Sequence, residues 1–124
     1  MLLFANAKIN IGLNITGKRN DGYHELQTVF YPIPFFDIIE ILPNNKSDIS
    51  FGTSGLQVDS THEDNLCVKA YRIMKKHYDI PGFTIHLHKQ IPFGSGLGGG
   101  SADAAFILKG INQMANLQLS NNTL

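Results

Sequence analysis

Glycine makes up five of the ten residues from Pro92 to Ser101, which read Pro-Phe-Gly-Ser-Gly-Leu-Gly-Gly-Gly-Ser. Because glycine gains little from pleated packing and loses the most entropy on ordering, a strand cannot continue through this segment. The segment instead exposes backbone N–H groups, and the helix expected after it adds the positive end of its dipole. The sequence therefore predicts a phosphate-binding loop between a strand and a helix.

Two familiar phosphate-loop patterns fit this segment poorly. Gly94, Gly96 and Gly99 have the G-x-G-x-x-G spacing of dinucleotide-binding proteins, but residues 115–119 hold no Asp or Glu at the expected distance. The Walker loop ends in Gly-Lys-Ser/Thr, and no lysine occurs between Gly94 and Phe106. A flexible linker without a ligand is the remaining alternative, and the large ordering entropy of so many glycines argues against it.

The composition of the chain indicates one folded domain. Of its 124 residues, 43% are hydrophobic and 16% are charged, which is enough for a core. Lys plus Arg equals Asp plus Glu, so no basic excess points to nucleic acid or to an anionic membrane. There is no signal-peptide pattern, no apolar run of membrane-spanning length and only one cysteine, Cys67. We expect a cytoplasmic protein without disulfide bonds, in which Cys67 packs in the first helix.

Hydrophobic periodicity predicts the elements that must position the loop. Strands are expected over 7–15, 26–33, 36–42, 49–51 and 83–87. Pro32 and Pro34 separate the second of these strands from the third. Helices are expected over about 65–77, after a capping box formed by Ser60 and Glu63, and over about 101–115. This order predicts an α+β fold, with a mostly antiparallel mixed sheet and packed helices.

The segment 92–102 resembles the ATP-binding loop of the GHMP kinases, which include galactokinase, homoserine kinase and mevalonate kinase. The shared pattern is Pro, three residues, Gly-Leu-Gly, small residues and Ser-Ala. Segments 7–10, 19–28 and 62–66 also match, and they most resemble GHMP kinases that act on a cytidylylated methylerythritol. The resemblance implies that residues 1–124 are an N-terminal GHMP kinase domain, with the ribosomal protein S5 domain 2-like fold.

The activity that the resemblance implies is transfer of the γ-phosphoryl group of ATP, with Mg²⁺, to the 2-hydroxyl of a cytidylylated methylerythritol in isoprenoid biosynthesis. Another GHMP small-molecule kinase, such as homoserine kinase, and a non-catalytic nucleotide-binding module remain alternatives. The family also carries a Gly-Ala-Asp-Val-Pro segment, whose Asp takes the substrate proton, and a C-terminal domain. Neither occurs in this sequence. We therefore expect an incomplete domain that is inactive alone and that self-associates through exposed core edges.

The resemblance assigns the substrate-binding residues. Lys8 is expected to be catalytic, beside the reacting hydroxyl, and Asn10 to contact the substrate. The strand pattern alone favours a solvated face for both residues. Tyr23, His24 and Phe30 are expected to surround the cytosine end of the substrate, where aromatic rings stack on a base. Phe30 fits core packing equally well.

The resemblance also assigns the ATP-binding residues. Asn65 and Leu66 are expected to lie against the adenine, although Leu66 equally fits the core. Ser101 is expected to place its hydroxyl on a phosphate or on Mg²⁺, and a helix N-cap is its structural alternative. The other expected ATP-binding residues are Pro92, Gly94, Ser95, Gly96, Leu97, Gly98, Gly99, Gly100 and Ala102.

His86 and His88 are the side chains that most suggest a metal site. They share one face of the strand predicted over 83–87 and its continuation, and no third ligand lies near them in the sequence. Two histidines without a third ligand are more typical of a solvated strand face than of a zinc centre. We therefore predict no metal site there.

Overall fold

The computed structural model describes residues 1–57 and 64–124. In these ranges, a four-stranded sheet has the order β1-β2-β4-β3. β2 is antiparallel to both β1 and β4, whereas β3 is parallel to β4, so the predicted α+β fold with a mixed sheet is confirmed. The elements are β1 (Leu2–Lys18), β2 (His24–Pro43), β3 (Ser50–Gly55), α1 (Leu66–His77), β4 (Phe83–Lys89) and α2 (Gly99–Met114).

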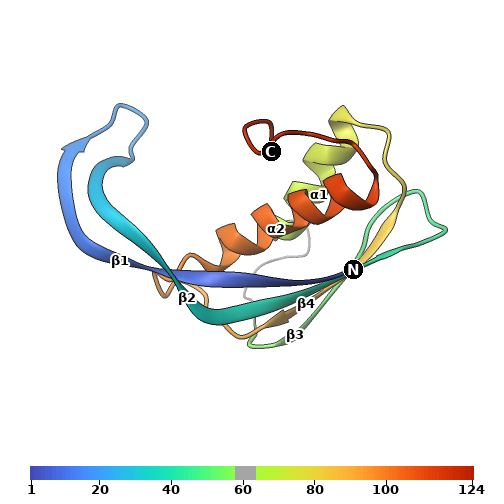
Figure 1. Cartoon of the computed structure of the whole chain (residues 1–124), viewed down its shortest axis with the longest axis horizontal. Coiled ribbons are helices and arrows are strands. Elements are labelled where there is room, and N and C mark those ends of the chain that lie inside the picture. Colours follow the sequence, from blue (N-terminus) through green and yellow to red (C-terminus); the bar gives the residue numbers. More distant parts are fainter. Residues whose placement is uncertain (58–63) are drawn as a thin grey trace.

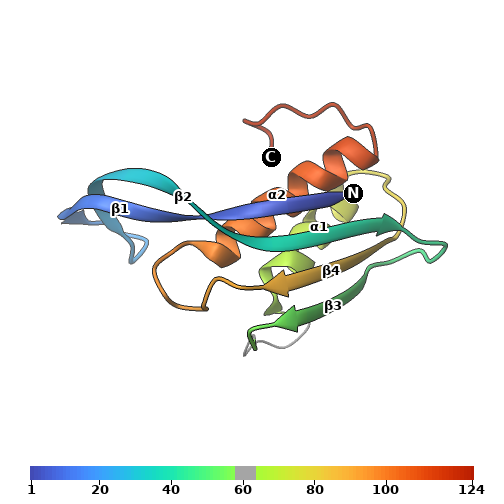
Figure 2. The ribbon, with the colours of Figure 1, turned by 60° about the horizontal axis from the view of Figure 1, so that its bottom comes forward.

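Both helices lie on the same face of the sheet (Figure 1, Figure 2). The core forms between them and the inward side chains of the strands, which alternate along β2 and β4 as period two requires. Burying each large apolar side chain contributes about 1.5–3 kcal/mol, which holds the helices on the sheet. The largest fully buried side chains include Ile39, Ile41, Ile85, Leu87, Tyr71, Ile107 and Ile111.

The predicted strands 26–33 and 36–42 form one continuous strand, β2, so the predicted break at Pro32 and Pro34 is wrong. Asn6 pairs with Phe36 and Lys8 pairs with Pro32, so the register between β1 and β2 shifts at the prolines. Pairing of β2 with β4 covers only residues 38–43. Pro32 and Pro34 lie outside that region. Their lack of an N–H group therefore removes no hydrogen bond to β4.

Beyond the sheet, β1 and β2 continue as a two-stranded arm that curls toward the side carrying α2 (Figure 1). Apolar residues alternate along one face of β1 from Ala7 to Ile15. Ala7 is buried, whereas the other four, Ile9, Ile11, Leu13 and Ile15, are exposed. These side chains lie past the part of β2 that pairs with β4, so the helices do not cover them. The alternating pattern therefore identifies the strand, but it does not show which part of the apolar face is buried.

The structure identifies the N-cap of each helix. Asn65 caps α1, and its Oδ1 accepts the N–H of Cys67 at 2.9 Å. The predicted capping box at Ser60 and Glu63 lies outside the described residues. Gly98 is the N-cap of α2, so Ser101 is the third helical residue and its alternative role as N-cap is wrong. Cys67 is buried in the core, as predicted.

Within the described ranges, neither helix combines the length and the apolar character that crossing a membrane requires.

Candidate functional site

The glycine loop connects the end of β4 to the start of α2, and every second residue from Gly94 to Gly98 has a positive φ. Gly94, Gly96 and Gly98 have φ of +69°, +75° and +75°, which L side chains rarely adopt. Backbone that includes left-handed residues can form concave groups of N–H donors that bind anions. The glycines are therefore required by the shape of the loop.

The start of α2 adds further free N–H groups. The N–H of Ala102 donates to the carbonyl of Gly98 at 3.0 Å, which is the first hydrogen bond of the helix. The amides of Gly99, Gly100 and Ser101 precede that bond and have no acceptor within the helix. The first turn holds no acidic residue, so the positive end of the helix dipole is not neutralised there.

Lys8 joins β1 to the loop through its backbone and its side chain. Its N–H donates to the carbonyl of Leu97 at 2.9 Å, and its Nζ donates to the carbonyl of Gly96 at 2.7 Å. Nζ also donates to Asn10 Oδ1 at 3.2 Å and lies 5.3 Å from the centroid of the Phe30 ring. The structure thus brings three of the predicted site residues on β1 and β2 to the edge of the glycine loop.

Two pockets adjoin at this point. A cavity of about 460 Å³ is lined by Lys8 and by residues of the glycine loop, including Ser101. A mainly apolar cavity of about 270 Å³ lies next to it, with Asn65, Cys67 and Leu87 in its wall. Leu66, Phe93 and Gly100 line both cavities. An apolar pocket that opens beside a loop and helix start with free amides is suited to a ligand with a flat apolar end and an anionic end.

The other predicted loop residues have separate places. Leu66 is half exposed on this shared wall, so its alternative role as core is wrong. The hydroxyl of Ser95 donates to the carbonyl of Pro92 at 2.8 Å and shapes the loop from within. Leu97 and Ala102 take part through the backbone bonds to Lys8 and Gly98 described above.

Tyr23 and His24 lie at the other end of the arm and line neither pocket. The turn before them is tight, since Asp21 Oδ1 accepts the N–H of Tyr23 at 3.1 Å and Asp21 pairs with Arg19 at 2.7 Å. Both side chains are exposed, and His24 pairs in register with Lys18 rather than with a residue near Lys8. The structure does not bring these two residues together with the glycine loop.

A buried charged cluster beneath the glycine loop was not predicted. Lys89 Nζ donates to Asp37 Oδ2 at 2.5 Å and to Asp103 Oδ2 at 2.7 Å. The three residues are at most 4% exposed. Asp37 Oδ1 also accepts the N–H groups of Gln90 at 2.7 Å and of Ile91 at 2.8 Å, where the loop begins. One carboxylate thus binds the loop and an ammonium together.

Burial and hydrogen bonding determine the charges of this cluster. Burial alone would lower the pKa of Lys89, but hydrogen bonds to Asp103 and Asp37 outweigh it and raise that pKa. Burial raises the pKa of Asp103 to about 6, and the hydrogen bond from Lys89 only partly opposes it. Oδ1 of Asp103 is buried without a hydrogen-bond partner, which disfavours the charged form and agrees with the raised pKa.

The sequence held a signal for this cluster. Phe83, Ile85 and Leu87 alternate on the inward face of β4, and the next position on that face is Lys89. On β2, Asp37, Ile39 and Ile41 occupy every second position and face inward in the same way. Opposite charges at two inward positions of neighbouring strands indicate a buried ion pair.

His86 and His88 lie on the opposite face of the sheet. The hydroxyl of Ser54 is 2.8 Å from His86 Nε2 and 3.0 Å from His88 Nδ1. Among the residues that the structure describes, no three His, Cys, Asp or Glu side chains are grouped as metal ligands.

Comparison with known proteins gives consistent matches. The profile of the GHMP kinases N terminal domain matches residues 65–124. A 4-diphosphocytidyl-2-C-methyl-D-erythritol kinase from Bacteroides fragilis is 52% identical over 126 residues, covering 100% of this chain and 46% of the relative. The chain spans about half the length of the curated relatives it matches.

Solved structures also match. A crystal structure of 4-(cytidine 5'-diphospho)-2C-methyl-D-erythritol kinase superposes with a TM-score of 0.77 at 32% identity, covering 99% of this chain and 45% of the other. A crystal structure of mevalonate kinase superposes with a TM-score of 0.74 at 17% identity, covering 99% of this chain and 43% of the other. Because the identity is low, this match shows the fold alone.

Proposed function

Because this chain belongs to the GHMP kinases, we propose that residues 1–124 form the nucleotide-binding N-terminal domain of a kinase. The proposed reaction transfers the γ-phosphoryl group of ATP to the 2-hydroxyl of 4-diphosphocytidyl-2-C-methyl-D-erythritol. The names of the similar relatives support this substrate. The observation that carries the proposal is the contact between Lys8 and the glycine loop, since it places a cation beside a phosphate-binding backbone.

The two adjoining pockets fit the two ends of ATP. The triphosphate lies in the larger pocket, where the amides of Gly99, Gly100 and Ser101 donate to its oxygens. The adenine enters the apolar pocket past Leu66 and Phe93, with Asn65 in its wall. The loop also leaves room for phosphate, because a Cβ at Gly94 or Gly96 would have no other heavy atom within 4 Å.

Lys8 stabilises the charge that moves during transfer. As the substrate oxygen attacks the γ-phosphorus, the bond from phosphorus to the bridging oxygen breaks and ADP leaves. Charge develops on the transferring group, and an ammonium beside the phosphate loop lowers its energy. Asn10 holds Nζ of Lys8 in place by accepting its hydrogen bond. Since a protonated lysine cannot accept the hydroxyl proton, a base elsewhere in the full-length protein takes it.

Mg²⁺ would be held mainly by phosphate oxygens and water, which are the ligands that it prefers beside a nucleotide. The hydroxyl of Ser101 is the protein ligand that we assign to it. Ser101 is exposed and lines the larger pocket, so its oxygen is on the phosphate side of α2. The ion would neutralise part of the triphosphate charge.

The arm is the proposed place of the cytosine end of the substrate. Tyr23, His24 and Phe30 are exposed on it, and aromatic rings of this kind stack on pyrimidines. The arm curls toward the side that carries α2, so a substrate of extended shape would follow it from Lys8 to Tyr23 (Figure 1). We also propose a cytoplasmic location, since the reaction consumes ATP.

The proposal is tested with the full-length gene product. ATP binding is measured by calorimetry, and ADP release is measured with 4-diphosphocytidyl-2-C-methyl-D-erythritol, homoserine and mevalonate as separate acceptors. We expect turnover with the first acceptor only. Turnover with homoserine would favour another GHMP kinase activity. Binding of ATP without turnover of any acceptor would instead favour a nucleotide-binding module.

A further inference from the structure

The glycine loop is held at both of its ends by one buried cluster. Before the loop, the N–H groups of Gln90 and Ile91 donate to Asp37 Oδ1. After the loop, Asp103 in the second turn of α2 accepts from Lys89, which donates to Asp37 Oδ2 as well. Asp37 on β2 is therefore common to the entry and the exit of the loop.

The cluster also contacts the turn of α2 that offers free amides. A Cβ placed on Gly99 would lie 3.0 Å from Lys89 Nζ and 2.8 Å from Ile91 Cγ2. Lys89 and Ile91 thus pack directly beneath the first residue of the helix. Displacing either of them would move the backbone whose N–H groups form the larger pocket.

Stability alone is a weak explanation for this arrangement. Two buried carboxylates and one buried ammonium lose their hydration, and well-packed apolar residues often hold a core equally well. Asp37 is 0% exposed and each of its oxygens accepts hydrogen bonds, so its position is tightly determined. An acceptor shared by the loop backbone and the ammonium determines orientation, which apolar packing does not.

We propose that Asp37 is a positioning residue for the nucleotide: by binding the loop amides and Lys89 together, it sets the glycine loop in its phosphate-binding geometry before the ligand arrives. It touches neither the nucleotide nor the reacting atoms. Its effect on affinity comes from preorganisation, since a loop that is already ordered loses less entropy on binding. The part of this proposal that concerns ATP rests on the proposed function.

The test compares Asp37→Ala and Asp37→Asn with the wild-type protein, in the full-length chain. Asp37→Asn keeps an oxygen for the amides of Gln90 and Ile91 but loses the charge that binds Lys89. We expect amide hydrogen exchange across residues 90–100 to accelerate about tenfold or more in Asp37→Ala and less in Asp37→Asn. We expect the dissociation constant for ATP to rise in the same order, by about tenfold in Asp37→Ala.

Ile111→Ala is the matched control for stability. Ile111 is fully buried in α2, away from the glycine loop, so its truncation destabilises the core without touching Asp37. We expect exchange in residues 90–100 and affinity for ATP to stay near the wild-type values in this control. If Asp37→Ala does not fold, Asp37→Asn carries the comparison.

The two proposals fail in different ways. Exchange in residues 90–100 that is no faster in either Asp37 variant than in Ile111→Ala would overturn the positioning role. If the Asp37 variants exchange faster but the wild-type protein does not bind ATP, Asp37 still orders the loop. In that case the proposal that the loop binds a nucleotide is wrong. Equal affinity of the wild type and both variants for ATP would also overturn the proposal, because preorganisation would then contribute nothing to binding.

Discussion

Lys8 Nζ lies 2.7 Å from the carbonyl oxygen of Gly96, so a side chain of β1 binds the glycine loop at its open side. The backbone N–H of Lys8 binds the neighbouring carbonyl of Leu97 at 2.9 Å. The loop is thus bound by β1 on one side and by Asp37 and Lys89 beneath. A ligand that enters the larger pocket meets an ammonium that is already in place, with a backbone carbonyl as its present acceptor.

Lys8→Ala is expected to impair phosphoryl transfer far more than nucleotide binding. Removing one donor that stabilises transition-state charge lowers kcat by about 10²–10³-fold in other enzymes. Because the free amides of α2 remain, we expect the dissociation constant for ATP to change by less than about tenfold. Steady-state kinetics and calorimetry on the full-length protein measure the two quantities. Normal turnover by Lys8→Ala would show that the catalytic role assigned to Lys8 is wrong.

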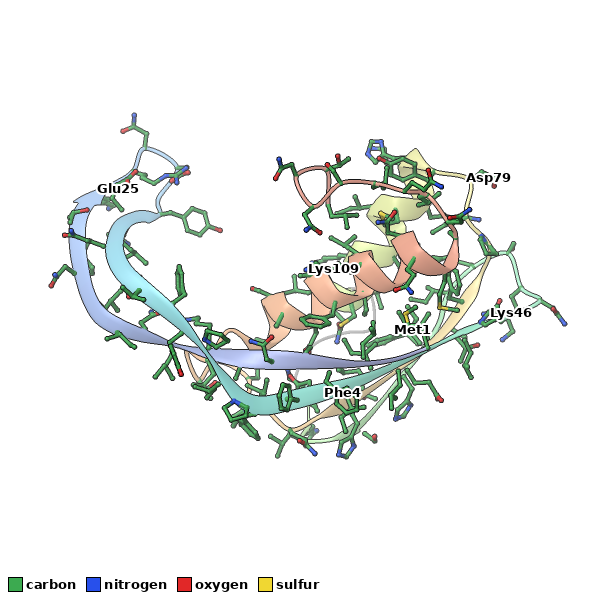
Figure 3. All side chains as sticks on the ribbon, in the orientation of Figure 1. Met1, Phe4, Glu25, Lys46, Asp79 and Lys109 are labelled. Carbon is green, nitrogen blue, oxygen red and sulfur yellow. The ribbon has the colours of Figure 1, made fainter. Side chains whose placement is uncertain are left out.

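Lys46→Ala is the control for that experiment. Lys46 is exposed in the turn after β2, and Figure 3 shows it at the opposite end of the molecule from the arm that carries Glu25. Loss of this charge should leave kcat unchanged, because Lys46 lies beside Gly82 at the start of β4, whereas the loop follows the other end of that strand. Salt screens exposed charges over such a length. A similar loss in both variants would indicate a general effect of net charge.

Gly98→Ala is expected to harm the site more than Gly94→Ala. Both glycines have positive φ, so an alanine at either position carries backbone strain of roughly 1–2 kcal/mol. A Cβ at Gly98 would also lie 3.0 Å from Lys8 Cε, whereas a Cβ at Gly94 would have open space around it. Denaturant unfolding should therefore show loss of stability in both variants, and kcat should fall further in Gly98→Ala. Equal kcat in the two variants would argue against steric coupling of Gly98 to Lys8.

Gly99→Ala and Gly100→Ala are expected to have opposite effects on stability. Both residues are helical, and alanine in a helix is favoured over glycine by up to about 1 kcal/mol. A Cβ at Gly99 would lie 2.8 Å from Ile91 Cγ2, whereas a Cβ at Gly100 would make an ordinary 3.6 Å contact with Leu66 Cδ1. In thermal unfolding, the melting temperature of Gly99→Ala should be below that of the wild type, and that of Gly100→Ala should equal or exceed it. Stabilisation by Gly99→Ala would contradict the close approach.

The glycine loop could be found from sequence because its signal is local: a run of glycines before a helix needs no tertiary information. Lys8 was assigned through the family resemblance, since the strand pattern alone favours a solvated face. The buried charges needed more, since only the pairing of β2 with β4 brings Asp37 and Lys89 together. The continuity of β2 through Pro32 also depends on which edge of the strand is paired, and a single sequence does not contain that information.

The exposure of the arm could not be predicted from the sequence for a related reason. Alternation identifies the two faces of a strand, but coverage of one face depends on how far the helices extend over the sheet. Ile9 to Ile15 alternate like core residues and are exposed in this structure. Self-association through exposed core edges stays a prediction, as does the assignment of Tyr23 and His24 to the cytosine end of the substrate.

The contribution of Asp103 to the stability of this protein should fall as the pH rises from about 4 to 6. Burial raises the pKa of this carboxyl group in the folded state to about 6, from an ordinary 3.8. Between these values the folded protein keeps a proton that the unfolded chain has lost, so ionisation favours unfolding. Asp103→Asn has no such proton. Its free energy of unfolding, relative to the wild type, should therefore increase with pH across this range and level off above it.

Urea unfolding of both proteins at several pH values between 3.5 and 8 measures this difference. Its change across the range is expected to be about 3 kcal/mol, since the pKa rises from 3.8 to about 6 and one unit of pKa corresponds to about 1.4 kcal/mol. The charged groups that face Asp103 are Lys89 and Asp37, and the raised pKa of Lys89 keeps it protonated throughout. Other carboxyl groups titrate in both proteins and cancel in the difference. The amide oxygen introduced by Asp103→Asn would still accept the hydrogen bond from Lys89. A difference in free energy of unfolding that is constant with pH therefore reflects altered packing, and only its change with pH reports the buried proton. A flat difference would show that Asp103 ionises as it does in the unfolded chain.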